Sequence, residues 1–110
     1  MAFKSLFIAH APDADPAIHR CSITTGMAHF SAVLIKNQAQ ALEVCREFVR
    51  EQQIDSIILC PGFTHGDIAD IVRSVGPAVA VCPSRSDGPG SRIALEALRR
   101  AGWFQPPTKI

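Results

Sequence analysis

The chain has 110 residues, of which 47% are hydrophobic and 19% charged, and its formal net charge is +1. This length fits one small domain, and the apolar content can bury a core, which excludes general disorder. The near-neutral charge excludes a chain-wide basic surface for nucleic acid. No apolar run approaches the roughly 20 residues that span a bilayer, and the start lacks the apolar segment of a signal peptide. We therefore expect a soluble, cytoplasmic protein with no nucleic-acid or membrane partner.

The first part of the chain predicts a buried strand, a loop and a β-hairpin. The apolar run of residues 3–9 has the length of a strand, and the Pro- and Asp-rich stretch 11–16 cannot continue it. β-Branched residues on both sides of Thr25-Gly26 indicate a hairpin with strands near residues 19–24 and 28–36.

The middle of the chain predicts two helices, each with a local capping signal. Asn37 is a good N-cap for a helix over residues 37–53. Thr64 caps a second helix that runs to about Val75, with Asp67 as its capping-box partner and Gly76 at its end. The expected buried stripes are Ala41, Leu42, Cys45, Phe48 and Val49 in the first helix, and Ile68, Ile71, Val72 and Val75 in the second.

Two short apolar runs and a last helix complete the pattern. Residues 55–60 and 78–82 are apolar on both faces, as in the interior of a parallel sheet. Ser91 or Asp87 is expected to cap a helix that reaches about Ala101. The side chains expected to face inward there are Ile93, Ala94, Ala97, Leu98 and Ala101.

This order of elements predicts a small Rossmann-like α/β domain in two or three layers. It would have about five strands and three helices, in a mostly parallel sheet with one β-hairpin. Residues 1–104 are expected to form the single domain and residues 105–110 a flexible C-terminal tail. Because so small a domain leaves part of its sheet uncovered, we also expect a homo-oligomer.

The four cysteines, Cys21, Cys45, Cys60 and Cys82, are far apart and irregularly spaced. No C-x-x-C pair or zinc-finger spacing occurs, and three of the four lie in apolar segments. The pattern predicts free thiols, mostly buried.

Ligands of open α/β sheets bind beyond the carboxyl ends of the strands, which directs attention to the residues after each predicted strand. The loop of residues 84–92 is rich in Gly, Ser and Arg and leads into a helix, a combination that suits a small anionic ligand. The loop matches neither the Walker A motif nor the G-x-G-x-x-G motif, so no nucleotide ligand is implied. The candidate ligand-binding residues are Arg85, Asp87, Gly88, Gly90, Ser91 and Arg92.

A second hypothesis is a thiol-dependent enzyme. Cys60 follows a strand and precedes a helix, where a thiolate is favoured, and His65 or His10 would act as its base. A metal site built from these three residues with Cys82 or Asp13 has no short ligand pair to support it, so no metal is expected, and the sequence names no cofactor. A third hypothesis is a non-catalytic interaction module that uses Trp103-Phe104 and the hairpin.

Three segments, FIAHAPDADP, DSIILCPGFTH and DGPGSRIALEAL, give the chain a resemblance to a family of short bacterial α/β proteins classed as a domain of unknown function. The resemblance implies an intact α/β domain up to Trp103-Phe104 and supplies no activity or catalytic residues. The motif positions His10, Asp13, Cys60, His65, Asp87 and Ser91 coincide with the strand-end residues identified above.

Overall fold

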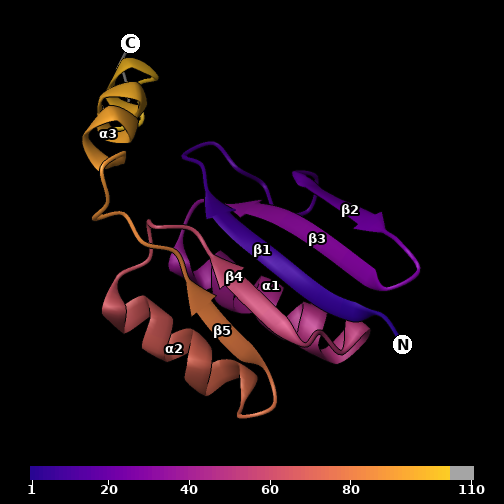
Figure 1. The fold of residues 1–110 in the computed structure, drawn as a ribbon. Helices are drawn as coiled ribbons and strands as arrows, with labels where there is room; N and C mark the ends of the chain where they lie inside the picture. The colour runs from indigo at the N-terminus through magenta and orange to yellow at the C-terminus, as the bar shows by residue number, and fades with distance from the viewer. Residues whose placement is uncertain (105–110) are drawn as a thin grey trace.

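The polypeptide forms five strands and three helices within residues 1–104, the part that the computed structural model describes (Figure 1). This α/β composition confirms the predicted fold class. The tail expected at residues 105–110 lies outside the described residues. The strands are β1 (Phe3–His10), β2 (Arg20–Thr24), β3 (Ala28–Ile35), β4 (Ser56–Leu59) and β5 (Ala80–Pro83). The helices are α1 (Gln38–Gln52), α2 (His65–Val75) and α3 (Ser91–Arg100).

The strands form one sheet in the order β2-β3-β1-β4-β5. Strand β1 is central and pairs in parallel with β3 and β4, β5 pairs in parallel with β4, and the hairpin strand β2 is antiparallel to β3. The connections through α1 and α2 move in the same direction across the sheet. Since such connections are right-handed, both helices lie on one face, as Figure 1 shows.

The hydrophobic core lies between that face and the two helices. Side chains alternate along each strand, and one set, including Leu6, Ile8 and Ile57, is completely buried beneath α1 and α2. The helices contribute Ala41, Val44, Cys45, Phe48, Ile71 and Val75.

No helix covers the opposite face of the sheet in the described part of the chain (Figure 1). We call this surface the open face. Strand alternation and register place only apolar, Ser and Cys side chains on it, with no charged residue. It consists of Phe3, Ser5, Phe7, Ala9, Cys21, Ile23, Ala28, Phe30, Ala32, Leu34, Ser56, Ile58, Ala80 and Cys82.

The helix signals in the middle of the chain are confirmed. The Asn37 side chain accepts from the Gln40 backbone N–H at 2.9 Å and begins α1. Thr64 and Asp67 form a reciprocal capping box at the start of α2. Gly76, with a positive φ of 82°, ends α2 in the left-handed half of backbone space that favours glycine. One stripe residue differs from expectation, because Val72 remains 47% exposed.

The expectations for α3 are wrong in two respects. Neither Ser91 nor Asp87 caps this helix, since Gly90 is its N-cap and no side chain bonds there. The expected inward-facing residues also have no core to face, because none of the residues of α3 is buried. The helix extends away from the sheet beyond its carboxyl edge (Figure 1).

The cysteines are free, as expected, but their burial differs from the prediction. Cys45 is buried in the core, and burial raises the pKa of its thiol to about 12. Cys60 is half-buried, whereas Cys21 and Cys82 are exposed. Both exposed thiols lie on the open face, where no helix of the described residues covers the side chains of the strands. No helix within residues 1–104 is long and apolar enough to cross a membrane.

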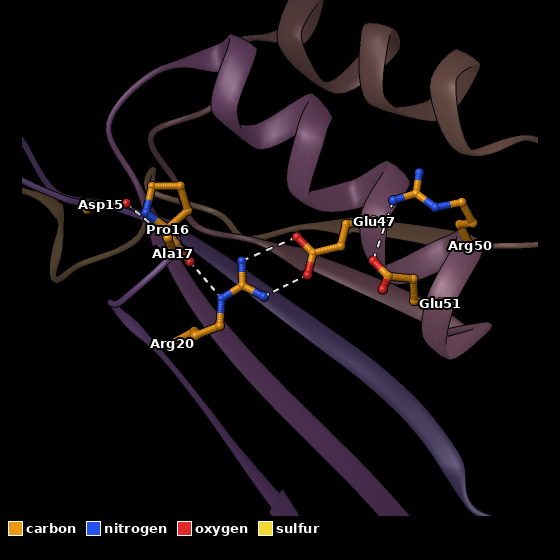
Figure 2. Close-up of polar contacts among 7 residues, drawn as sticks. All are labelled: Asp15, Pro16, Ala17, Arg20, Glu47, Arg50 and Glu51. Carbon is orange, nitrogen blue, oxygen red and sulfur yellow. Dashed lines mark hydrogen bonds and ion pairs between the residues drawn. The ribbon is translucent and has the colours of Figure 1, made fainter.

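Arg20 ties the edge strand β2 to helix α1 (Figure 2). Its guanidinium donates to both carboxylate oxygens of Glu47, at 2.8 and 3.3 Å, and its Nε donates to the Pro16 carbonyl at 2.6 Å. The guanidinium also lies 5.5 Å from the centroid of the Phe48 ring. One side chain thus connects the loop before β2, the strand itself and the helix that covers the sheet.

We expect Arg20→Ala to lower the free energy of unfolding by about 1 kcal/mol, since bidentate pairs exceed the usual surface ion pair. Arg50 is the matched control, because its pair with Glu51 is longer, at 3.4 Å, and both side chains are at least 60% exposed. Arg50→Ala should change stability by less than about 0.3 kcal/mol. Urea unfolding of both variants measures the difference, and equal effects would contradict the assigned role of Arg20.

Candidate functional site

Two parallel strands bring His10 and Cys60 together at the carboxyl edge of the sheet. Ile8 of β1 lies opposite Leu59 of β4, and the Cys60 N–H donates to the Ile8 carbonyl at 3.0 Å. This register places the residue that ends β1 beside the residue that follows β4. The His10 Nδ1 atom lies 3.1 Å from the Cys60 Sγ atom, within hydrogen-bonding distance of a thiol.

The turn between β4 and α2 encloses the His10 ring. The buried ring of Phe63 packs against the imidazole, with 4.4 Å between centroids and an interplanar angle of 51°. Gly62 covers another side, because a Cβ at this position would lie only 2.8 Å from His10 Nδ1. A glycine is therefore required here for the chain to approach the ring so closely.

The surroundings of His10 favour its neutral form. Desolvation by burial lowers the pKa of His10 below its ordinary value of 6.5, and the nearby Asp67 carboxylate opposes this effect in part. The imidazole is therefore neutral near pH 7. When its Nε2 atom carries the proton, Nδ1 can accept the proton of the Cys60 thiol.

The start of α2 adds hydrogen-bond donors to this edge. The Asp67 N–H is taken by the Thr64 hydroxyl at 3.0 Å, whereas the N–H groups of His65 and Gly66 have no partner within the helix. Gln38, at the start of α1, donates to the Asp67 carbonyl at 3.0 Å. Its Oε1 atom is buried without a partner in the described part of the chain, so the helix starts meet in a polar region.

His65, the other expected base, is exposed on the first turn of α2. Within residues 1–104 no hydrogen bond joins its ring to Cys60. Of the two candidate histidines, His10 is therefore the one in contact with the thiol.

The loop of the anion hypothesis begins at the same edge but then leaves it. The Ser84 N–H donates to the Leu59 carbonyl at 2.9 Å, after which the chain runs outward to α3 (Figure 1). Arg85 is occupied by Asp87, through contacts of 2.9 and 3.0 Å, and this bond lowers the pKa of Asp87 and raises that of Arg85. Among the described residues, no hydrogen bond connects the side chains of this loop, or Arg92, to His10 or Cys60.

Of the residues of the metal alternative, His10 and Cys60 are in contact, and among the described residues no hydrogen bond joins the others to them. Cys82 lies on the open face and Asp13 is exposed in the loop after β1. Over residues 1–104 no three His, Cys, Asp or Glu side chains are grouped as metal ligands.

Three residues of this edge were not identified from sequence: Gln38, Gly62 and Phe63. Phe63 had a usable signal, because it precedes the N-cap and Ile68 stands at the fourth helical position, which is the spacing of a hydrophobic staple. Gly62 had no local signal, because its proximity to His10 depends on a strand that ends 52 residues earlier. Gln38 had no comparable signal.

The lowered pKa of His10 makes stability depend on pH. The unfolded chain binds the proton more readily, so the contribution of His10 is present above about pH 6.5 and is lost as pH falls through the folded-state pKa. We expect His10→Gln to flatten the decline in unfolding free energy between about pH 7.5 and 5. His65→Gln, a substitution at an exposed histidine, should retain the wild-type decline in urea unfolding. Parallel curves for wild type and His10→Gln would contradict the assignment.

Comparison with known proteins gives one match. No curated protein and no solved structure is detectably similar to this chain. The model of a family of unknown function, DUF6506, matches residues 3–93, which include all five strands, both core helices and the first residues of α3. The match ends before the Trp103-Phe104 pair to which the resemblance was expected to extend. The chain, with its His10–Cys60 pair at the carboxyl edge of the sheet, thus belongs to this family of unknown function.

Proposed function

We propose that this protein is a thiol-dependent enzyme in which Cys60 is the nucleophile and His10 its general base. The observation that supports the proposal is the 3.1 Å separation of His10 Nδ1 and Cys60 Sγ. A nucleophile within hydrogen-bonding distance of a base, with the base held by further groups, is the usual arrangement for covalent catalysis. Here Phe63 and Gly62 hold the base.

The reaction class that fits is acyl transfer from a small carbonyl substrate. Nδ1 takes the thiol proton as Sγ forms a bond to the carbonyl carbon, and the carbonyl π electrons move to oxygen. When the carbonyl re-forms, the leaving group departs and receives the proton from His10. Unpaired N–H groups at the start of α2 are donors suited to the negative oxygen. Burial lowers the pKa of His10, so the imidazole is available near pH 7 to accept this proton.

The other cysteines lack this environment and serve as internal references. Cys45 is buried with a pKa raised to about 12, which suppresses its thiolate at neutral pH. Cys82 is exposed, and its polar neighbour is the Ser56 hydroxyl at 3.9 Å. Among the described residues, no hydrogen bond joins a cysteine other than Cys60 to a histidine.

The test is the rate at which each cysteine is alkylated by iodoacetamide near pH 7, measured by peptide mass spectrometry. We expect Cys60 to react at least about tenfold faster than Cys82, in keeping with the size of general-base effects. His10→Gln should abolish this advantage. Gly62→Ala should reduce it as well, because the added Cβ displaces the His10 ring.

His65→Gln is the matched control and should leave the Cys60 rate unchanged. The proposal fails if Cys60 reacts no faster than Cys82 in the wild type, or if His10→Gln leaves its rate intact. Circular dichroism of each variant shows whether the fold is retained.

A second candidate function is anion binding at the start of α3. It is supported by Gly90, which leaves the first-turn N–H groups without a side-chain cap, and by the exposed Arg92. We expect Arg92→Ala to raise the Kd for inorganic phosphate, measured by NMR titration, by more than about tenfold. Arg99→Ala, at the other end of α3, should have little effect. An unchanged Kd in Arg92→Ala would remove this loop from any anion site.

A further inference from the structure

The open face is an apolar surface with nothing on it in the described part of the chain. Phe3 is 57% exposed, Ile23 63% and Leu34 39%. A hollow of about 440 Å³ lies on this face. Its lining includes the apolar residues Phe7, Ala32, Leu34 and Ile18, and also His19 and Arg20 at the start of β2. Contiguous apolar surfaces of this kind mark interaction sites, whereas single exposed apolar residues do not.

Helix α3 carries a second apolar surface without a partner. One side of the helix is formed by apolar residues, namely Ile93, Ala94, Ala97, Leu98 and the following Ala101, and Ile93 is 69% exposed. Arg92, Glu96, Arg99 and Arg100 occupy the other side. An isolated helix of ten residues is marginal in water, so α3 requires a surface against which to pack.

The two surfaces match in chemistry and in size. No strand position on the open face and no residue on the apolar side of α3 is charged, and Arg20, which lines the hollow, is already paired with Glu47. A highly charged partner therefore has nothing to pair with there. A ten-residue helix is about 15 Å long and covers roughly three strands. The whole face measures roughly 500 Å², from strand spacings of about 4.8 Å and lengths of about 20 Å. The apolar side of α3 adds roughly 150 Å², from a length of about 15 Å and a width of about 10 Å. Specific interfaces bury about 600 to 1,000 Å² of each partner, a range that the face reaches only with α3 added.

We propose that two copies of this chain form a dimer in which α3 of each copy packs on the open face of the other. The direction of the chain favours packing of α3 on the sheet of a second copy over packing on its own sheet. The linker of residues 84–90 leaves β5 at the carboxyl edge, and α3 points outward from the sheet (Figure 1). Reciprocal exchange pairs each open face with a helix and closes with two-fold symmetry.

The first experiment measures molar mass by light scattering on the eluting protein at about 50 μM. The wild type should be a dimer. The double variant Ile93→Asp/Leu98→Asp should be a monomer, with its dimer Kd raised at least about 100-fold, because it places charges on the apolar side of α3. Arg99→Asp also adds a negative charge to α3, but on the polar side, and should remain a dimer.

These variants keep the test independent of folding, since α3 has no buried residue and the core does not depend on it. Circular dichroism should show the sheet intact. A monomeric wild type at this concentration would overturn the proposal. A dimer that survives Ile93→Asp/Leu98→Asp would also overturn it, because a contact between the sheets alone would then suffice.

A second experiment distinguishes packing of α3 on the partner's open face from packing of α3 on its own open face. Ala97→Cys puts a thiol on the apolar side of α3. The open face that α3 occupies offers it two exposed thiols, Cys21 on β2 and Cys82 on β5. After oxidation, a disulfide-linked dimer that is absent when both native cysteines are changed to Ser supports exchange. An internal disulfide in a monomer shows α3 on its own sheet and overturns it.

Discussion

The handedness of two connections determines most of this structure. Both the β3–α1–β4 and the β4–α2–β5 connections move in one direction across the sheet, and right-handed crossovers then place both helices on one face. All of the sheet's buried core forms on that side, from residues such as Leu6, Ile57 and Phe48. Two further features follow from the same constraint: the starts of α1 and α2 meet at the carboxyl edge, and neither helix covers the opposite face.

The proposed site depends on that carboxyl edge and on the desolvation of the His10 ring, which disfavours its protonated form. Parallel pairing of β1 with β4 sets His10 beside Cys60, and the turn through Gly62 and Phe63 removes water from the imidazole. Desolvation disfavours the protonated ring, which lowers folding stability in acid, and it keeps the ring able to accept a proton at neutral pH. The same burial thus decreases acid stability and provides a base for the thiol.

Local signals in the sequence predicted the local structure well, and the differences arise where partners are distant. The caps at Asn37 and Thr64 were predictable because the groups they satisfy lie three residues away. The strand-end argument selected His10, His65 and Cys60, but the choice between the histidines required the register of β1 against β4, which no local pattern encodes. The errors at α3 and Cys82 have one cause: periodicity reveals an apolar surface but not whether the same chain covers it.

The open face and helix α3, which have no partner, hold half of the large exposed apolar side chains of the described chain. One sheet face and two helices bury the hydrophobic core and leave these side chains outside it. Of the ten large hydrophobic residues that are exposed among residues 1–104, three lie on the open face and two on α3. Their clustering on a flat sheet and on an amphipathic helix is the arrangement expected of surfaces that bury each other. The proposed exchange of α3 between two copies would bury both of these groups at once.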